Sequence, residues 1–259
     1  MPDWRTWEAS LQWVSVVVEA ALIVRLVHER LYVVYRWFFA LVLFDAIRSI
    51  AGLAISRDTN AYAVLFVYST PLMWLLYFLV VSELYELVLK DRPGIATAGR
   101  WVLWGGLIAA AVVTAWTLPG DFANEKEKYV NLRAYFAFHR AILSTLTGLV
   151  LVLTAFLFWF PVMLRRNINY YFLGFLIWFG GATAMLLLRN RMGQQATWIA
   201  GAGYLGASIL CFLIWIAKLT QEGEQAETTI GHLWNPAATS RLLDQLDQVN
   251  ARLLRWLRR

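Results

Sequence analysis

The chain has 259 residues, of which 60% are hydrophobic and only 15% are charged, whereas an average soluble domain has about 25% charged residues. This composition excludes an ordinary soluble domain and favours a chain that lies in a lipid bilayer. The net charge of +6 does not point to nucleic acid, because membrane proteins concentrate Lys and Arg in cytoplasmic loops and beside lipid headgroups.

Seven apolar runs follow one another along the chain, and each is long enough to cross about 30 Å of hydrocarbon. They lie at 10–28, 37–56, 61–89, 101–118, 135–163, 169–188 and 197–218. Arg and Lys favour the first, third and fifth connections and the region after residue 218, which the positive-inside rule makes cytoplasmic. We therefore predict an all-α bundle of seven transmembrane helices, residues 1–218, in the inner (cytoplasmic) membrane, with the N-terminus outside and the C-terminus inside.

The composition changes after residue 218. Residues 219–235 include the stretch QEGEQAETT, which is acidic and poor in apolar residues, so we expect a flexible linker there. Residues 236–259 predict a cytoplasmic amphipathic helix. Its apolar stripe and the arginines beside it would dock on a membrane surface or on a protein partner, and they are Leu242, Leu246, Val249, Leu253 and Trp256 with Arg252 and Arg255.

Two interpretations of this helix remain open. Two heptads could pair as a coiled coil with a protein partner or a second copy of the chain, but two heptads are short for a stable coiled coil. An amphipathic helix on the inner leaflet, with Leu and Trp toward the lipid and arginines toward anionic headgroups, is the interpretation we prefer.

Three ionisable residues at membrane depth form the first candidate site, because charges in a bilayer are costly and mark function by default. Glu19 and Arg48 lie at similar depths of the first two runs, and Asp45 precedes Arg48 by one helical turn. A buried ion-pair clamp between the two helices is the preferred interpretation. A polar centre for a ligand or a proton is the alternative.

A second candidate cluster lies near the cytoplasmic end of the third run and consists of Glu83, Glu86 and Arg92. Anchoring at the membrane interface is the preferred role for it. Pro71 should kink the same helix and free a backbone carbonyl. His139, near the outer end of the fifth run, is expected to be a hydrogen-bonded interfacial residue, with a pH sensor as the alternative.

Small residues in the last two runs predict close helix packing. Gly201, Gly203 and Gly206 spell the dinucleotide fingerprint G-x-G-x-x-G, but that motif works only between a strand and a helix, and here it lies within a helix. Gly180 and Gly181 provide a similar small surface in the preceding run. We expect both groups to serve packing.

No reaction is indicated by the remaining chemistry. Cys211 is the only cysteine, and the three histidines have no metal-ligand spacing. A buried lysine for retinal, a facing histidine pair for haem and the motifs of intramembrane proteases are all missing. We therefore expect a non-enzymatic protein without metal or cofactor.

Three segments resemble a group of bacterial seven-helix membrane proteins of about this length that have no assigned activity. The segments are HERLYVVYRWFFALVLFDAIRS, ELYELVLKDRPGIATAGRW and VNARLLRWLRR. The topology is also similar, more loosely, to the seven-helix sensory modules of bacterial signalling receptors. This resemblance implies a receptor-like sensor or accessory protein, with a structural subunit of a larger membrane complex and a small-solute transporter as alternatives.

Overall fold

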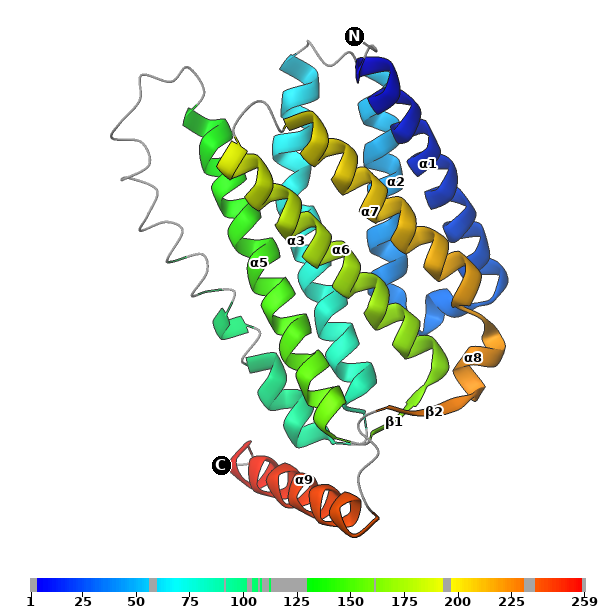
Figure 1. Cartoon of the computed structure of the whole chain (residues 1–259), viewed down its shortest axis with the longest axis vertical. Coiled ribbons are helices and arrows are strands. Elements are labelled where there is room, and N and C mark those ends of the chain that lie inside the picture. Colours follow the sequence, from blue (N-terminus) through cyan, green and yellow to red (C-terminus); the bar gives the residue numbers. More distant parts are fainter. Residues whose placement is uncertain are drawn as a thin grey trace.

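The computed structural model describes residues 4–55, 60–90, 92–101, 104–106, 108, 112, 130–160, 162–192, 197–230 and 236–257. Six long helices in these ranges stand side by side in one bundle (Figure 1). They are α1 (Trp4–His28), α2 (Arg36–Ala54), α3 (Asn60–Val88), α5 (Val130–Trp159), α6 (Arg166–Met192) and α7 (Thr197–Lys218). The shorter elements are η1 (Leu31–Val33), β1 (Val162–Arg165), α8 (Gln221–Gln225) and β2 (Glu227–Ile230), and α9 (Pro236–Leu257) ends the described chain.

Each of the six bundle helices is long and apolar enough to cross a membrane, which indicates a multi-pass membrane protein. The outer faces of these helices carry exposed apolar side chains. Four of them, each more than half exposed, are Val17, Val24, Ile47 and Val152. Such faces suit contact with lipid rather than water. The predicted run 101–118 lies mostly outside the described residues, of which 93–101, 104–106, 108 and 112 are helical.

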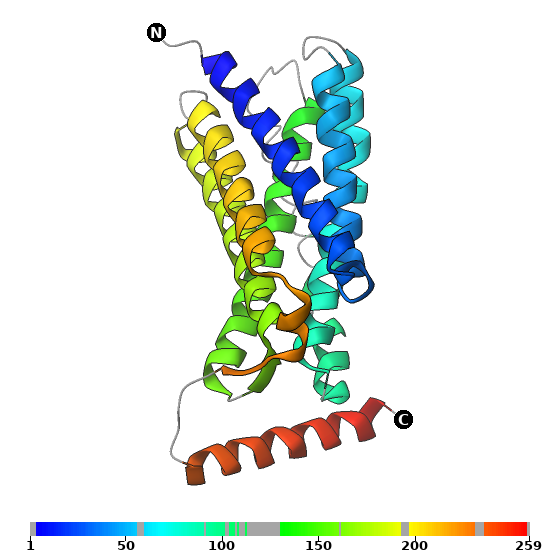
Figure 2. The same ribbon diagram turned by 90° about the vertical axis from the view of Figure 1, so that its right-hand side faces the viewer.

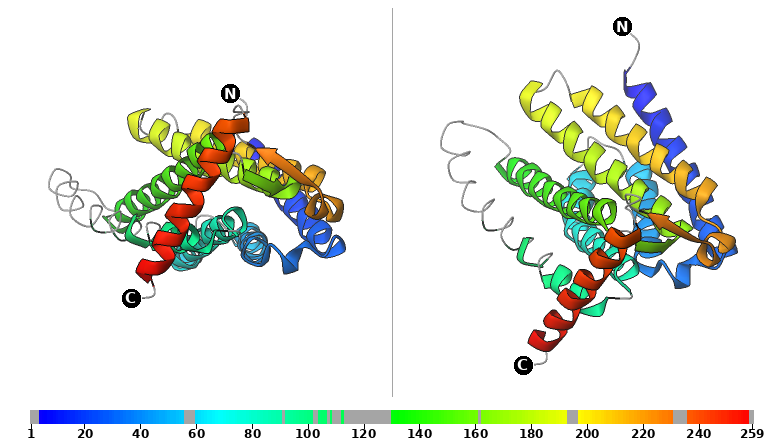
Figure 3. Two further views of the ribbon diagram at one scale, coloured as in Figure 1. Left: turned by 90° about the horizontal axis from the view of Figure 1, so that it is seen from below. Right: turned by 60° about the horizontal axis from the view of Figure 1, so that its bottom comes forward.

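The six helices form a ring in chain order. Each packs against its neighbour along the chain, α7 closes the ring against α1, and α3 also touches α6 across the centre. Figure 3 shows this arrangement from the end at which α9 lies. Residues of α1 and α7, which are far apart in the sequence, are therefore brought together.

α3 and α5 are neighbours that run in the same direction. The indole Nε1 of Trp74 donates a hydrogen bond to Nδ1 of His139 at 2.9 Å. About three turns further along both helices, the hydroxyl of Tyr85 donates to the backbone oxygen of Leu149, also at 2.9 Å. Both helices thus end at the α9 end of the bundle (Figure 1), while α5 begins at the opposite end.

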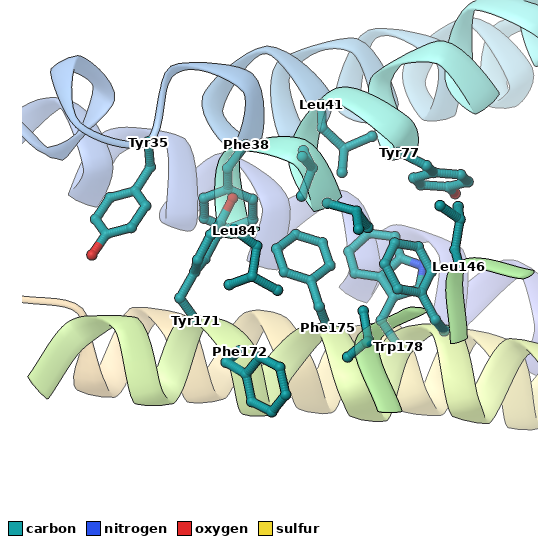
Figure 4. Close-up of a cluster of buried hydrophobic side chains, with 14 of the residues drawn as sticks. Tyr35, Phe38, Leu41, Tyr77, Leu84, Leu146, Tyr171, Phe172, Phe175 and Trp178 are labelled. Carbon is teal, nitrogen blue, oxygen red and sulfur yellow. The ribbon is translucent and has the colours of Figure 1, made fainter. Parts of the chain in front are cut away.

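Aromatic side chains fill the centre of the ring. Phe38 of α2 lies 4.6 Å from Trp215 of α7 and 5.1 Å from Tyr171 of α6, between ring centroids, and Phe175 lies 4.8 Å from the same tryptophan. Edge-to-face and tilted contacts of this kind add stability beyond their buried area. We call the whole set the aromatic column, and its members are Tyr35, Phe38, Tyr77, Tyr171, Phe175, Trp178 and Trp215. All of them except Trp215 are labelled in Figure 4.

Residues 219–230, for which the sequence predicted a flexible linker, instead form α8 and β2. The Thr220 hydroxyl caps α8 by accepting from the backbone N–H of Gly223 at 3.1 Å. β2 then pairs with β1 in antiparallel register, with Arg165 opposite Glu227 and Val162 opposite Ile230. The chain that leaves α7 is therefore bound to the start of α6, and residues 231–235 lie outside the described part.

The helix α9 runs across the end of the bundle instead of along it (Figure 2). Leu246 is its buried contact, at 5% exposure. The side-chain oxygen of Asn250 accepts from the backbone N–H groups of Gly94 and Ile95 at 2.8 and 3.3 Å. This side chain caps the helical segment that begins at residue 93, so the last helix is fastened to the connection that follows α3.

Candidate functional site

Glu19 is buried on α1, at 2% exposure. One carboxylate oxygen accepts from the Ser15 hydroxyl, one turn earlier, at 2.8 Å. The other, Oε2, is buried and has no hydrogen-bond partner among the described residues. Ser49 and Asp45 of α2 face this carboxylate. A carboxylate in this position is costly unless something satisfies it.

Among the described residues no ion pair joins Arg48 to Glu19, the partner that the sequence suggested. Among the described side chains its guanidinium lies over the ring of Phe66, 4.5 Å from the centroid, and interacts electrostatically with Asp45. Its Nε is buried and has no hydrogen-bond partner in the described part of the chain. A cation–π contact compensates only part of the cost of burying this charge. Glu19, Asp45 and Arg48 are thus neighbours, but they are not closed into a clamp.

Two tyrosines that the sequence analysis missed complete this group. Tyr77 of α3 and Tyr204 of α7 interact with one another, with Asp45 and with Arg48. Tyr204 lies seven residues into an otherwise apolar run, near the depth of Arg48, and that match was the available signal. We call Glu19, Asp45, Arg48, Tyr77 and Tyr204 the polar cluster.

The remaining two helices of the ring also reach the polar cluster. Trp178 of α6 is 1% exposed, and its indole interacts with the Tyr204 side chain. The geometry of this contact does not meet the criteria of a hydrogen bond, and Nε1 has no other partner among the described residues. His139 of α5 faces Arg48. His139 is half-buried and accepts from the indole of Trp74, which confirms the hydrogen bond expected for it. All six described spanning helices contribute polar groups here.

The polar cluster combines acceptors and donors that are not matched to each other. Glu19 Oε2 can accept, while Arg48 Nε and Trp178 Nε1 can only donate. Among the described residues no group of His, Cys, Asp or Glu side chains could hold a metal ion. The polar cluster thus offers both an acceptor and donors to a hydrogen-bonding partner.

The predicted inner-edge cluster separates into three different contacts. Glu83 is buried and caps α2, because its two oxygens accept from the backbone N–H groups of Trp37 at 3.1 Å and Phe38 at 3.3 Å. The Tyr171 hydroxyl donates to the same carboxylate at 3.0 Å. Glu86, in contrast, is exposed and pairs with an arginine of the next helical segment. Arg92 lies 3.3 Å from a carboxylate oxygen of α9.

Glu224 of α8 joins the two sides of the bundle at the α9 end. It accepts from the Tyr35 hydroxyl, which precedes α2, and from Arg165 Nη1 and Asn167 Nδ2, both at 2.9 Å, where α6 begins. Burial and the facing carboxylate raise the pKa of the Tyr35 hydroxyl well above its usual value, so Tyr35 remains a donor. We call these four residues the clasp.

The predicted packing glycines divide into two groups. A Cβ at Gly181 would lie 3.1 Å from Cβ of Ala207, and a Cβ at Gly203 would overlap the Met185 side chain, so both allow α6 and α7 to approach closely. A Cβ at Gly180, Gly201 or Gly206 would meet open space.

Pro71 lies within α3, which the structure describes as one helix from Asn60 to Val88. The Thr70 and Ser69 hydroxyls both donate to the backbone oxygen of Phe66, at 2.5 and 3.3 Å. Hydroxyls that bond back to the preceding turn are a usual accompaniment of helix bending. Pro71 itself is exposed, on the outside of the bundle.

The stripe predicted on α9 is divided by its contact with the bundle. Leu246 is buried, and Leu242 and Leu253 are half-buried. Val249 and Trp256 remain 48% and 72% exposed, and Arg252 and Arg255 are exposed beside them.

No protein-family model, curated protein or solved structure matches the chain. The predicted resemblance to bacterial seven-helix proteins and sensory modules therefore stays a prediction.

Proposed function

We propose that this chain is a receptor-like sensor of the inner membrane, non-enzymatic and built of seven transmembrane helices with the N-terminus outside. A small polar ligand would occupy the polar cluster, and α9 would present the response at the cytoplasmic surface.

The parallel course of α3 and α5 supports the seventh span. Since both helices end at the α9 end, the chain between residues 88 and 130 has to return to the opposite end, and the apolar run 101–118 is long enough to do so. Arg25, Arg92, Arg165 and Lys218 lie at or near the α9 ends of their helices, which supports a cytoplasmic α9 end.

The observation that carries the sensor proposal is the unmatched polar cluster. Oε2 of Glu19 and Nε of Arg48 are buried and have no hydrogen-bond partner among the described residues. Such groups are expensive in a bilayer, and a bound molecule could satisfy them. A ligand shifts a protein between conformations only through different contacts in each. One that bridges α1 and α2 to α6 and α7 would favour the conformation in which these helices lie close together.

The aromatic column supports a route from the polar cluster to the cytoplasmic side. Tyr77 belongs to both groups, and Tyr171 lies 4.7 Å from Tyr35 of the clasp, between ring centroids. Tightly packed side chains transmit a displacement because the interior has few voids to absorb it. A change in helix spacing at the polar cluster would thus reach the clasp.

The test is purification from native membranes in mild detergent, followed by mass spectrometry of every co-purifying protein, lipid and small molecule. A small molecule retained by the wild type and by Glu86→Gln, but lost from Glu19→Gln and Arg48→Gln, would support the sensor. Retention that is unchanged in the Glu19 and Arg48 variants would overturn the assignment of the site.

A structural subunit is the second candidate, and the open space at Gly180, Gly201 and Gly206 favours it, because small residues at a lipid-facing position allow another helix to approach. A stoichiometric protein partner in the same purification, independent of the Glu19 and Arg48 variants, would select this candidate. The transporter alternative requires paired broken helices, and α3, α6 and α7 are each described as one continuous helix.

A further inference from the structure

The side of α9 that touches the bundle is polar as well as apolar. Leu246 is buried, Asn250 caps the segment that begins at residue 93, and Asp247 lies 3.3 Å from Nε of Arg92. Asp244 lies on the same side of the helix as Asp247, one turn earlier. Of the two aspartates, Asp247 meets the basic connection after α3, and Asp244 is exposed.

A different side of α9 remains uncovered. Val249 and Trp256 are seven residues apart, so they lie on one face of the helix, and Arg252 lies between them. Trp256 is 72% exposed, the highest value among the large apolar side chains that the structure describes on α9. Arg241 and Arg255 are exposed on the adjoining surface. This flank therefore combines apolar and basic residues, whereas the opposite side carries the aspartates.

The direction of α9 also matters. It crosses the end of the bundle (Figure 2), and its 22 residues span about 33 Å at 1.5 Å per residue. Because the bundle helices cross the bilayer, a helix that runs across their ends lies along the membrane surface. Amphipathic helices in this position insert their apolar side into the headgroup region and turn arginines toward phosphates.

We propose that α9 docks on the anionic inner leaflet through the flank formed by Val249, Arg252 and Trp256, while the adjoining face with Leu246 and Asn250 holds the bundle. Lipid phosphates are the ligands of Arg252 and Arg255, which can bind them through two N–H groups each. Trp256 occupies the headgroup layer, where tryptophan is favoured. The inference rests on the topology of the proposed function but not on a ligand in the polar cluster.

The experiment uses the full chain in nanodiscs with a single environment-sensitive fluorophore. Cys211→Ser removes the only native thiol, and a cysteine is then introduced at Val249 or, as the matched control, at Ala251, which is exposed on the side of Asp244 and Asp247. Each labelled protein is placed in zwitterionic phosphatidylcholine or in a mixture with phosphatidylserine. Quenching by acrylamide, which is neutral and so insensitive to surface charge, reports the access of water.

We expect phosphatidylserine to reduce quenching at position 249 by about twofold or more and to leave position 251 unchanged. Arg252→Gln with Arg255→Gln, or raised salt, should abolish the difference, because each arginine near an anionic surface contributes about fivefold to its binding and salt screens this attraction. Equal quenching at both positions in both lipids would overturn the proposal. Reduced quenching at position 249 that is the same in both lipids and in the arginine variant would also overturn it. Neither result depends on whether the polar cluster binds a ligand.

Discussion

Replacing Glu83 with Gln tests whether a side chain of α3 holds the beginning of α2. The carboxylate uses both oxygens, one for the N–H of Trp37 and the other for the N–H of Phe38 and the hydroxyl of Tyr171. Gln has nearly the same shape but only one oxygen, so its NH₂ group would face a backbone N–H that has no other acceptor among the described residues.

The expected loss combines two contributions. A buried donor left without an acceptor costs about 1–3 kcal/mol. Loss of a negative charge at a helix N-terminus costs about 0.3–1 kcal/mol at an exposed position and up to about 2 in a partly buried one. We therefore expect the free energy of unfolding to fall by about 2–4 kcal/mol in Glu83→Gln.

The assay is equilibrium unfolding of the full chain by SDS in mixed micelles, followed by far-ultraviolet circular dichroism. Glu86→Gln is the matched control, since Glu86 lies on the same helix but is 45% exposed and pairs with Arg100 at the surface. A surface pair of this kind contributes less than about 1 kcal/mol. Equal losses in the two variants would refute the capping role of Glu83.

Three further predictions follow from single contacts. Gly174→Ala should destabilise the protein by about 1–3 kcal/mol because the added Cβ would overlap the Trp215 indole. Gly180→Ala, where a Cβ would meet open space, should be neutral or slightly stabilising in the same SDS titration. Equal effects of the two substitutions would contradict this packing. Tyr35→Phe should speed amide hydrogen exchange in residues 221–230 through loss of the clasp contact, and unchanged exchange would show that the clasp does not hold this segment. Asn250→Ala should lower the free energy of unfolding by about 1 kcal/mol and raise exchange at the two N–H groups that it caps, and unaltered exchange there would argue against the cap.

The spanning helices could be predicted because they depend on local composition. Six of the seven apolar runs coincide with helices that are long and apolar enough to cross a membrane, and hydropathy suffices for that inference because a bilayer admits few other backbone structures. Equal depth on consecutive antiparallel helices predicted that Glu19 lies near Arg48, and the charged residue of α2 that faces Glu19 is instead Asp45, one turn earlier. Whether Glu19 and Arg48 form an ion pair depends on the directions of their side chains, and the depth of a residue in the bilayer does not specify these directions.

Contacts between distant segments could not be predicted in this way. Glu83 looked like an interfacial anchor because its partner is the N-terminus of α2, 45 and 46 residues earlier, and backbone N–H groups leave no mark in a sequence. Similarly, Glu224 lies 59 residues from Arg165 and 57 from Asn167. A polar, acidic stretch has the same composition whether it is solvated or held by such partners, so 219–230 was expected to be flexible.

The clasp affects how a movement of the bundle helices could be transmitted toward α9. A flexible linker would separate the tail from the bundle, because a loose chain transmits little of the position of its ends. Glu224 instead connects Tyr35, at the start of α2, with Arg165, at the start of α6, and Gln221 N–H donates to Glu29, just after α1, at 2.8 Å. Any movement of α1 and α2 away from α6 has to strain or break these contacts. A ligand that draws the same helices together at the polar cluster would therefore stabilise the clasp, and a mutation of the clasp should in turn weaken ligand retention, as reciprocal coupling between two sites requires.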